Sequence, residues 1–412
     1  MSDLEKKAIA VLHTNRREIV KQGVKYGFTC PSPTAYHWQW LWDSCFHAIA
    51  LRWNEPDFAK GELLSLLSGQ WEDGRIPNMV HIGKNWRFDS IIHNTGRDTS
   101  GITQPPIIAD AAMRVHAVSP DKGFLEKAYG PLVSYYEWLG TKREPKNDGL
   151  IEIYHPWESG IDNSPRWDSI FHIRRFHRKL FDLTKGRIML KFTGTKYDNE
   201  GMKRVSPYLV RGIDMNCYYY ANLKAMAAMA RELGKPAEAD AFEQRAQKTA
   251  DAVMKRMWSE EKQMFGDLIG RDEKLSVVPT LFSFMPLWAG LVSDERAKIM
   301  VGQLTDTKRF WTKYPVPTTD LTHPMFDPEG YWRGTVWINT NWFMIEGLAR
   351  YGYNDIAQDV KERTLKMVDA GGIREYYNPL TGEGLGAKSF AWSTLVIDLM
   401  HRDYSKKTGS ME

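Results

Sequence analysis

The stretch Asp214–Trp258, DMNCYYYANLKAMAAMARELGKPAEADAFEQRAQKTADAVMKRMW, decides the fold. Helical periodicity runs through it, and a single break at Gly234–Pro236 interrupts the pattern. Glycine and proline at such a break are typical of one helix ending and the next beginning. The stretch therefore predicts two helices, 214–233 and 236–258, that pack against each other as an antiparallel pair.

The same pattern continues over most of the chain. Further helices are predicted at 3–21, 43–53, 57–69, 105–117, 123–142, 277–291, 293–304, 338–351, 354–369 and 387–402. About twelve or thirteen helices in antiparallel pairs fit an all-α fold, an (α/α)6 barrel in which six helical hairpins form a toroid. The longer loops lie at 71–103, 146–213, 305–337 and 371–386. They hold most of the tryptophan, acid and arginine clusters, so we expect the active-site loops at one end of the barrel.

No linker of low complexity divides the 412 residues, so the chain is expected to form one catalytic domain, 1–412. The segment 170–205 is the best candidate for an insertion within it, and it could serve as a lid. Alternating side chains in Arg187–Phe192 predict a small strand inside this segment.

The charge balance argues against nucleic acid as a partner. Lys and Arg number 55 and Asp and Glu 51, which leaves a net charge of +4. Nucleic-acid binding needs a stronger and more clustered positive charge. The densest basic run, Arg174–Lys179, is interpreted as a solvated loop or lid edge, with contact to an anionic group as the alternative.

Cysteine usage and hydropathy indicate a cytoplasmic protein without metal. The three cysteines are odd in number and form no CxxC pair, which argues against a zinc site and a disulfide framework. The N-terminus lacks an apolar signal region, and no run of 18 apolar residues suggests a membrane span. We expect no metal and no organic cofactor. Aromatic side chains at the surface would also suit a homo-oligomer.

The chemistry is concentrated in Trp157–Asp168, where three carboxylates and two tryptophans share a segment with turn-forming residues. Glycosidic bond cleavage normally needs two carboxyl groups on opposite sides of the bond. Asp162 is the first candidate; the alternative is that it only shapes a turn or caps a helix. Glu375, after the glycine pair Gly371–Gly372, is the second; its alternative is a surface glutamate paired with Arg374.

The aromatic content supports a sugar-binding cleft. The chain holds 16 Trp, 18 Tyr and 17 Phe, many of them beside polar residues in predicted loops. Part of this content must fill the core. The remainder suits the apolar faces of sugar rings.

Four segments together resemble glycoside hydrolase family 63. Glu158–Asp168 resembles the acid loop of that family and, more loosely, of the trehalases. Trp40–Cys45 resembles its first sugar-binding loop, and Arg374–Pro379 the loop with the general base. Tyr331–Asn339 resembles the family's Trp-Arg-Gly-Pro-x-Trp segment, with Thr335 in place of the proline. The segments occur in family order and span nearly the whole chain.

The short chain and the segment Ser100–Pro106 are similar to compact bacterial members that hydrolyse α-mannosylglycerate and α-glucosylglycerate. The resemblance implies an inverting mechanism, in which Asp162 protonates the glycosidic oxygen and Glu375 activates a water. It also implies a set of substrate-binding residues: Tyr36, Trp40, Trp42, Asp43, Gln104, Trp167, Arg211, Tyr331, Trp332 and Trp337.

Within that set, the resemblance implies that Tyr36, Gln104 and Arg211 hold the glycerate. A carboxylate suits an arginine fork, and Arg166 and Arg333 are the alternatives to Arg211. Trp42 would stack on the sugar of the cleavage subsite, Asp43 would accept hydrogen bonds from its hydroxyls, and Trp337 would form part of the opposite wall. Whether this sugar is glucose or mannose stays open.

Three other functions compete with a glycosyl-glycerate hydrolase. The first is an inverting α-glucosidase for a neutral disaccharide or glucan end, as in trehalases or processing glucosidases. The second is a sugar epimerase or isomerase on the same barrel, which would need a histidine pair that the sequence does not offer. The third is a carbohydrate-binding protein without catalysis. Fold alone separates none of these.

Overall fold

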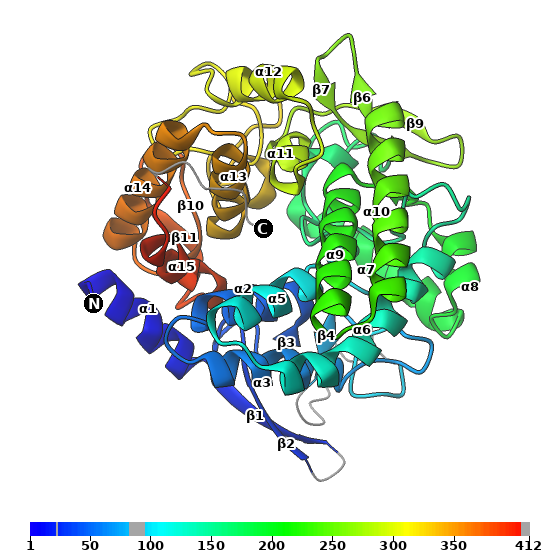
Figure 1. Ribbon diagram of the computed structural model, residues 1–412. Coiled ribbons are helices and arrows are strands. Elements are labelled where there is room, and N and C mark those ends of the chain that lie inside the picture. The colour runs from blue at the N-terminus through cyan, green and yellow to red at the C-terminus, as the bar shows by residue number, and fades with distance from the viewer. Residues whose placement is uncertain (22–23, 82–94, 405–412) are drawn as a thin grey trace.

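The helices form two concentric rings in the computed structural model, which describes residues 1–21, 24–81 and 95–404 (Figure 1). Residues 82–94 of the predicted loop 71–103 therefore lie outside the described part. The inner ring consists of α2 (Leu41–Leu51), α5 (Ile108–Val118), α9 (Ile213–Glu232), α11 (Met285–Ala289), α13 (Ile338–Arg350) and the turn η5 (Ala391–Leu395) with α15 (Val396–His401). Each member contacts the next, and η5 contacts α2, which closes the ring.

The outer ring covers the inner one pairwise. It consists of α1 (Asp3–Thr14), α3 (Pro56–Leu67), α6 (Lys122–Lys142), α10 (Pro236–Arg256), α12 (Asp294–Leu304) and α14 (Asn354–Gly371). The hairpins α2–α3, α9–α10 and α13–α14 are in direct contact, as the break at Gly234–Pro236 predicted for the second of them. The predicted (α/α)6 toroid is confirmed.

Burial explains which helices lie inside. All residues of α2 are buried, whereas α10 buries only one face, including Phe242, Ala246 and Val253. A helix that is apolar all round belongs in an interior, and an amphipathic helix belongs on its surface. Local signals set the ends: Asp121 caps α6 by accepting from the Phe124 amide, and proline begins α10.

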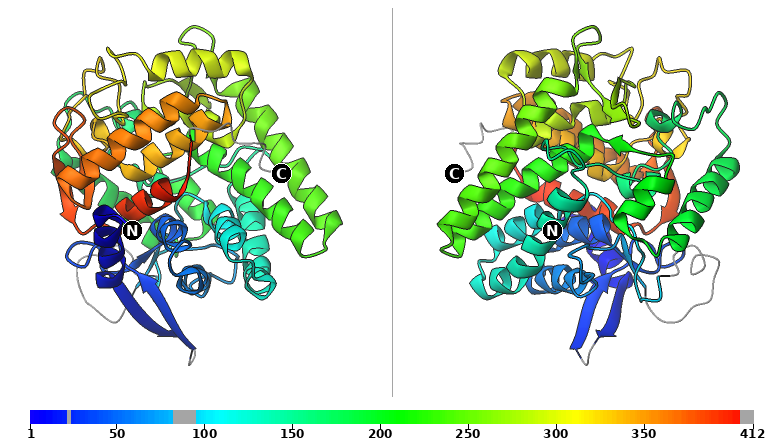
Figure 2. Two further views of the ribbon diagram at one scale, coloured as in Figure 1. Left: turned by 60° about the vertical axis from the view of Figure 1, so that its left-hand side comes forward. Right: turned by 90° about the vertical axis from the view of Figure 1, so that its right-hand side faces the viewer.

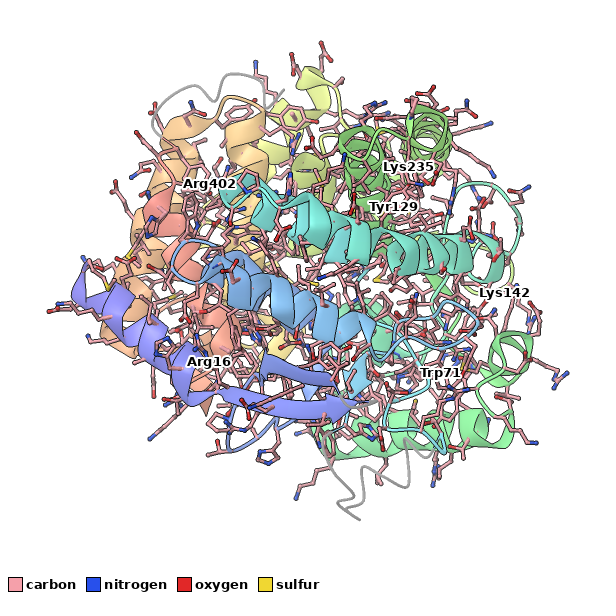
Figure 3. The ribbon with its side chains drawn as sticks, turned by 60° about the horizontal axis from the view of Figure 1, so that its bottom comes forward. Arg16, Trp71, Tyr129, Lys142, Lys235 and Arg402 are labelled. Carbon is pink, nitrogen blue, oxygen red and sulfur yellow. The ribbon has the colours of Figure 1, made fainter. Side chains whose placement is uncertain are left out.

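The outer surface shows how neighbouring helices of the outer ring are held together. Figure 3 shows α3 and α6 lying across this face, with Tyr129 of α6 beside Lys235 at the start of α10. The Tyr129 hydroxyl donates to Glu238 at 2.8 Å, and the Lys235 ammonium lies 5.1 Å from the tyrosine ring centre. These contacts hold α6 against the α9–α10 hairpin.

The predicted helix 3–21 is wrong in its second half. Helix α1 ends at Thr14, and β1 (Arg16–Lys21) and β2 (Val24–Thr29) form an antiparallel ribbon that projects from the ring (Figure 2). The β-branched residues and the glycines of this stretch favour a hairpin over a helix. Val20 and Val24 remain exposed on the ribbon.

The segment 170–205 contains helices where a strand was predicted. Arg187–Phe192 lies within α7 (Arg178–Gly194), which is followed by α8 (Asn199–Val205), so the predicted strand is wrong. Ile188, Met189 and Phe192 turn one face of α7 toward a small apolar cluster, separate from the main core, that includes Tyr154. Figure 2 shows the two helices as a layer beside the ring.

Other short elements replace the ends of two further predicted helices. The segment 277–291 contains the turn η3 (Leu281–Phe284) before α11, and 387–402 begins in β11. The remaining strands pair as β3 (Gln39–Trp40) with β4 (Met79–Val80), β5 (Val210–Arg211) with β8 (Asp267–Ile269), β8 with β9 (Lys274–Ser276), β6 (Trp258–Ser259) with β7 (Met264–Phe265), and β10 (Arg374–Tyr377) with β11 (Gly384–Lys388).

Among the described residues, no helix is long and apolar enough to cross a membrane. The same residues contain no group of three or more side chains suited to hold a metal ion. Cys30, Cys45 and Cys217 are all buried and unbridged.

Candidate active site

A cleft of about 740 Å³ brings together residues from loops that are far apart in the chain. This volume lies within the usual range for small-molecule sites. The lining includes Arg17, Tyr36, His37, Trp38, Trp40, Trp42, Asp43, Gln104, Trp157, Asp162, Asn163, Arg178, Asp182, Lys185, Tyr331, Glu375, Phe390 and Trp392. Both candidate carboxyl groups, Asp162 and Glu375, thus face one cavity.

Gly160 shapes the acid loop, Trp157–Asp168, around the cleft. The loop turns through η1 (Pro156–Ser159), and Gly160 ends this turn with φ at 73°, in the left-handed region that favours glycine. A Cβ atom at this position would lie 2.6 Å from the ring of Trp42. Glycine is therefore needed both for the turn and for the close packing of the loop on Trp42.

Buried ion pairs hold the acid loop from below. Arg143 binds both oxygens of Glu158, at 2.7 and 2.9 Å, and both side chains are almost fully buried. The Glu158 carboxylate also accepts from the amide of Tyr154 at 2.7 Å. Glu158 is therefore a structural partner of Arg143 and does not line the described cleft.

Arg166 and Arg333 fix the far end of the loop. Arg166 forms a buried fork on Asp214 at 2.8 and 3.0 Å and also binds Asp267. Arg333 binds Asp168 with two bonds. Both arginines, the alternatives for the glycerate carboxylate, are thus occupied by aspartates, and neither is among the described residues that line the cleft.

Asp162 projects from this loop into the cleft. Its Oδ2 atom accepts from the ammonium of Lys185 in α7, which also binds Asn163 at 2.7 Å and Asp182 at 2.9 Å. Lys185 is almost fully buried, although it contributes to the lining. No helix in the described chain begins directly after Asp162. The alternative that Asp162 caps a helix is therefore wrong.

Glu375 lies on β10, and its side chain meets the hydroxyls of two other segments. Its Oε1 accepts from the hydroxyls of Tyr36 at 3.2 Å and Tyr331 at 3.5 Å, and its Oε2 accepts from the amide of Ala387 at 2.9 Å. Burial raises the pKa of Glu375, and these hydrogen bonds oppose that rise. Glu375 is buried, and Arg374 instead donates to Gly386, so the alternative of a surface ion pair is wrong.

Asp43 is a further carboxyl of the cleft. It lies in the first turn of α2 beside Trp42, and burial raises its pKa to about 7, with the His47 charge opposing. The Trp42 ring lies edge-on to Trp392, with 5.3 Å between the ring centres. Asp43 and Trp42 both line the cleft, and their roles in hydroxyl binding and ring stacking stay predictions.

Tyr36, Trp40 and Gln104 also line the cleft, and their roles in substrate binding stay predictions. The Tyr36 and Trp40 rings meet edge-on at 6.0 Å. Burial, followed by the nearby Glu375 charge, raises the pKa of Tyr36, which keeps the hydroxyl protonated as a donor. Gln104 is buried at the start of the 104–107 loop before α5.

Three predicted tryptophans lie behind the cleft. Trp332 and Trp337 stack on each other at 3.7 Å with nearly parallel rings, and Trp167 donates its indole N–H to the Ile161 carbonyl under the acid loop. All three are buried and do not belong to the described lining. They support Tyr331 and the acid loop, and the predicted wall position of Trp337 is wrong.

Thr335, where the family pattern has proline, makes a polar link. Its hydroxyl donates to the Tyr331 carbonyl and accepts from the Trp337 indole N–H at 2.8 Å. Proline could make neither bond. The substitution therefore holds the Tyr331 backbone to the ring that supports it.

The predicted position of Arg211 in the glycerate site is wrong. Arg211 is buried on β5, where Asp148 and Glu273 both bind its guanidinium at 2.7 Å. It is not among the described residues of the cleft. Arg211 is buried and ion-paired with two carboxylates away from the described cleft, so a ligand in the cleft does not reach its guanidinium.

Two cations that the sequence did not single out occupy the cleft instead. Arg178 begins α7 and lies 4.9 Å from the centre of the Tyr331 ring, and Lys185 lies beside Asp162. Arg178 belongs to the basic run Arg174–Lys179, for which contact with an anionic group stays a prediction. Lys185 gave no signal because its partners Asp162 and Asn163 come from another segment.

A toroid of helix pairs with two acids among aromatic rings in one cleft is the arrangement of a glycoside hydrolase. The family comparison agrees. The chain belongs to the family of the mannosylglycerate hydrolase MGH1-like glycoside hydrolase domain, whose model matches residues 36–393. The protein is therefore an enzyme that cleaves glycosidic bonds.

Individual relatives cover nearly the whole chain. A mannosylglycerate hydrolase of Thermus thermophilus is 32% identical over 91% of this chain and 97% of its own length. The glucosylglycerate hydrolase of Mycolicibacterium hassiacum is 28% identical over 90% and 93%. A crystal structure of a family 63 mannosylglycerate hydrolase from Thermus thermophilus with Tris and D-glycerate has a TM-score of 0.86 and 30% identity, covering 97% of this chain and 100% of the other.

Proposed function

We propose that the protein is an inverting α-glycosidase that hydrolyses a small α-glycosyl glycerate, mannosylglycerate or glucosylglycerate, to free sugar and glycerate. The observation that carries the proposal is the cleft itself, in which Asp162 and Glu375 from distant loops meet aromatic rings and cationic side chains. Relatives named for each of the two substrates support the substrate class.

Asp162 would donate a proton to the glycosidic oxygen, and Glu375 would take a proton from a water attacking the opposite face of the sugar. An inverting pair stands roughly 6.5–9.5 Å apart to admit that water. Tyr36 and Tyr331 donate to Glu375 and line the same cleft as Asp162.

The sugar would bind in the inner part of the cleft. Trp42 offers an apolar face, and Asp43 accepts hydroxyl hydrogen bonds when ionised. The choice between glucose and mannose depends on the 2-hydroxyl, so both substrates belong in the test.

The glycerate would meet a cation near Asp162 in place of Arg211. Tyr36 and Gln104 keep the neutral hydrogen-bonding roles that the resemblance implies, and Arg178 and Lys185 supply the positive charge. A carboxylate ligand needs such a charge, whereas a neutral aglycone does not.

In the experiment, the purified enzyme is incubated separately with α-mannosylglycerate, α-glucosylglycerate and trehalose, and the released free sugar is measured. The proposal expects turnover of at least one glycerate substrate and none above background for Asp162→Asn. Turnover of trehalose alone would replace it with the neutral-substrate α-glucosidase. A lack of turnover with all three would contradict it.

We also propose a cytoplasmic location, because a reducing compartment suits three buried, unbridged cysteines. A homo-oligomer stays a prediction, which light scattering of the purified protein can test.

A further inference from the structure

Lys185 creates a conflict at the acid loop. A general acid must carry its proton when the glycosidic bond breaks. The ammonium of Lys185 instead donates to Oδ2 of Asp162, and an adjacent cation favours the ionised carboxylate. In the ligand-free enzyme, a buried ammonium thus contacts the carboxyl group that must carry the catalytic proton.

Three oxygen-bearing side chains surround the Lys185 ammonium. Asp162 and Asp182 supply two carboxylates, and Asn163 adds an amide oxygen. His155 faces Lys185 with a ring N–H that donates to the Lys185 carbonyl at 3.1 Å. Burial lowers the pKa of His155 to about 3, so the ring stays neutral and adds no charge.

The remaining walls around the ammonium are aromatic. The rings of Trp157 and Phe181 have their centres 5.8 and 5.2 Å from the Nζ atom. Asp162, Asn163 and Asp182 take up the three N–H donors of the ammonium, so a new partner from the cleft must displace one of them.

The substrate brings a competing carboxylate to this position. In a glycerate linked through its 2-oxygen, the carboxylate sits on the carbon next to the glycosidic oxygen. The oxygen that Asp162 protonates is therefore two bonds from the carboxylate carbon and three bonds from the carboxylate oxygens. Any cation that touches Asp162 from the cleft is within reach of that carboxylate.

We propose that Lys185 is a specificity-determining residue that binds the aglycone carboxylate and thereby releases Asp162 to carry the catalytic proton. The inference rests on the proposed function and deepens it. A neutral aglycone leaves the Lys185 ammonium in contact with Asp162. The enzyme then prefers a glycerate substrate in the proton-transfer step as well as in binding.

The first test needs no variant. It compares a 2-O-α-glycosyl glycerate with the matching glycosyl glycerol, which lacks only the carboxylate. The wild type should prefer the glycerate substrate roughly 100-fold in kcat/KM. The alkaline limb of its kcat profile should lie at least about one pH unit higher with glycerate than with the glycerol analogue. Coinciding limbs would overturn the inference.

The second test removes the ammonium. Lys185→Gln should lower kcat/KM for the glycerate substrate and raise it for the glycerol analogue, so that the preference falls below about 10-fold. Its alkaline limb should move to higher pH in the free enzyme. Lys185→Arg keeps the charge and should retain most of the preference. Lys191→Gln, an exposed residue of the same helix, is the matched control and should behave as the wild type.

Two results of the second test would overturn the inference. If Lys185→Gln loses kcat/KM equally for both substrates with an unchanged pH profile, Lys185 only supports α7. If the preference for the glycerate substrate is unchanged, Lys185 does not contact the carboxylate. Failure of the proposed function looks different: the wild type itself would then show no preference for the glycerate substrate. Thermal melts check that the variants fold.

Discussion

The hydroxyl of Tyr36 donates to Oε1 of Glu375 at 3.2 Å, although 339 positions separate the two residues in the chain. Closure of the ring brings them together, because Tyr36 precedes α2 and Glu375 precedes η5, and α2 contacts η5. The base of the proposed reaction thus depends on a donor from the opposite end of the sequence.

Replacing Tyr36 by phenylalanine should impair this base. The hydrogen bond opposes the rise in the Glu375 pKa, so its loss moves the acid limb of the kcat/KM profile to higher pH. We expect a roughly 10- to 100-fold loss of kcat/KM near neutral pH. The pH profile of hydrolysis is the measurement. Tyr26→Phe, on the β1–β2 ribbon, is the control, and an unshifted acid limb in Tyr36→Phe would exclude the role.

Glu158→Gln should destabilise the enzyme. Removing one partner of a buried ion pair leaves the Arg143 charge without compensation, which costs about 3–5 kcal/mol. Urea unfolding measures the change. Glu72→Gln breaks the exposed pair with Arg97 and should leave the midpoint unchanged. Equal midpoints for both variants would show that Arg143 does not depend on Glu158.

Asp43 should make stability depend on pH. Its pKa rises from 3.8 to about 7 on folding. At pH values between these two, the folded protein keeps a proton that the unfolded chain has lost. The contribution of Asp43 to the free energy of unfolding is complete below the unfolded pKa. It is lost as the pH rises toward 7, by up to about 1.4 kcal/mol per pH unit. The wild-type melting temperature minus that of Asp43→Asn should fall from pH 4 to pH 7. A constant difference would contradict the buried, protonated state.

Gly160→Ala should displace Trp42. The added Cβ would lie 2.6 Å from the indole at a backbone φ of 73°, which combines a clash with backbone strain. Gly234→Ala is the matched control, because Gly234 has a φ of 74° with nothing within 4 Å. We expect about 1–3 kcal/mol of extra destabilisation for Gly160→Ala, with a loss of activity that the control does not share. Equal effects would mean that backbone strain alone matters.

Much of the toroid could be predicted from the sequence because its helices alternate with clear breaks. Gly234–Pro236 separates two helices that the structure ends at 232 and begins at 236. The prediction failed where periodicity is ambiguous. Arg187–Phe192 alternates like a strand, yet Ile188, Met189 and Phe192 also form one helical face, and packing against Tyr154 selects the helix.

The site was predictable only where a local motif carries the chemistry. Asp162, Glu375, Trp42 and Asp43 lie in such motifs, and all of them reach the cleft. Arg211 did not, because its partners Asp148 and Glu273 come from segments that the sequence does not connect to it.

The most direct test of the central claim is proton NMR of the anomer released first from an α-glycosyl glycerate. Inversion by Asp162 and Glu375 predicts the β-anomer of the sugar before mutarotation, and no release by Asp162→Asn. Early release of the α-anomer would contradict the inverting assignment. Undiminished release by Asp162→Asn would exclude Asp162 as the acid.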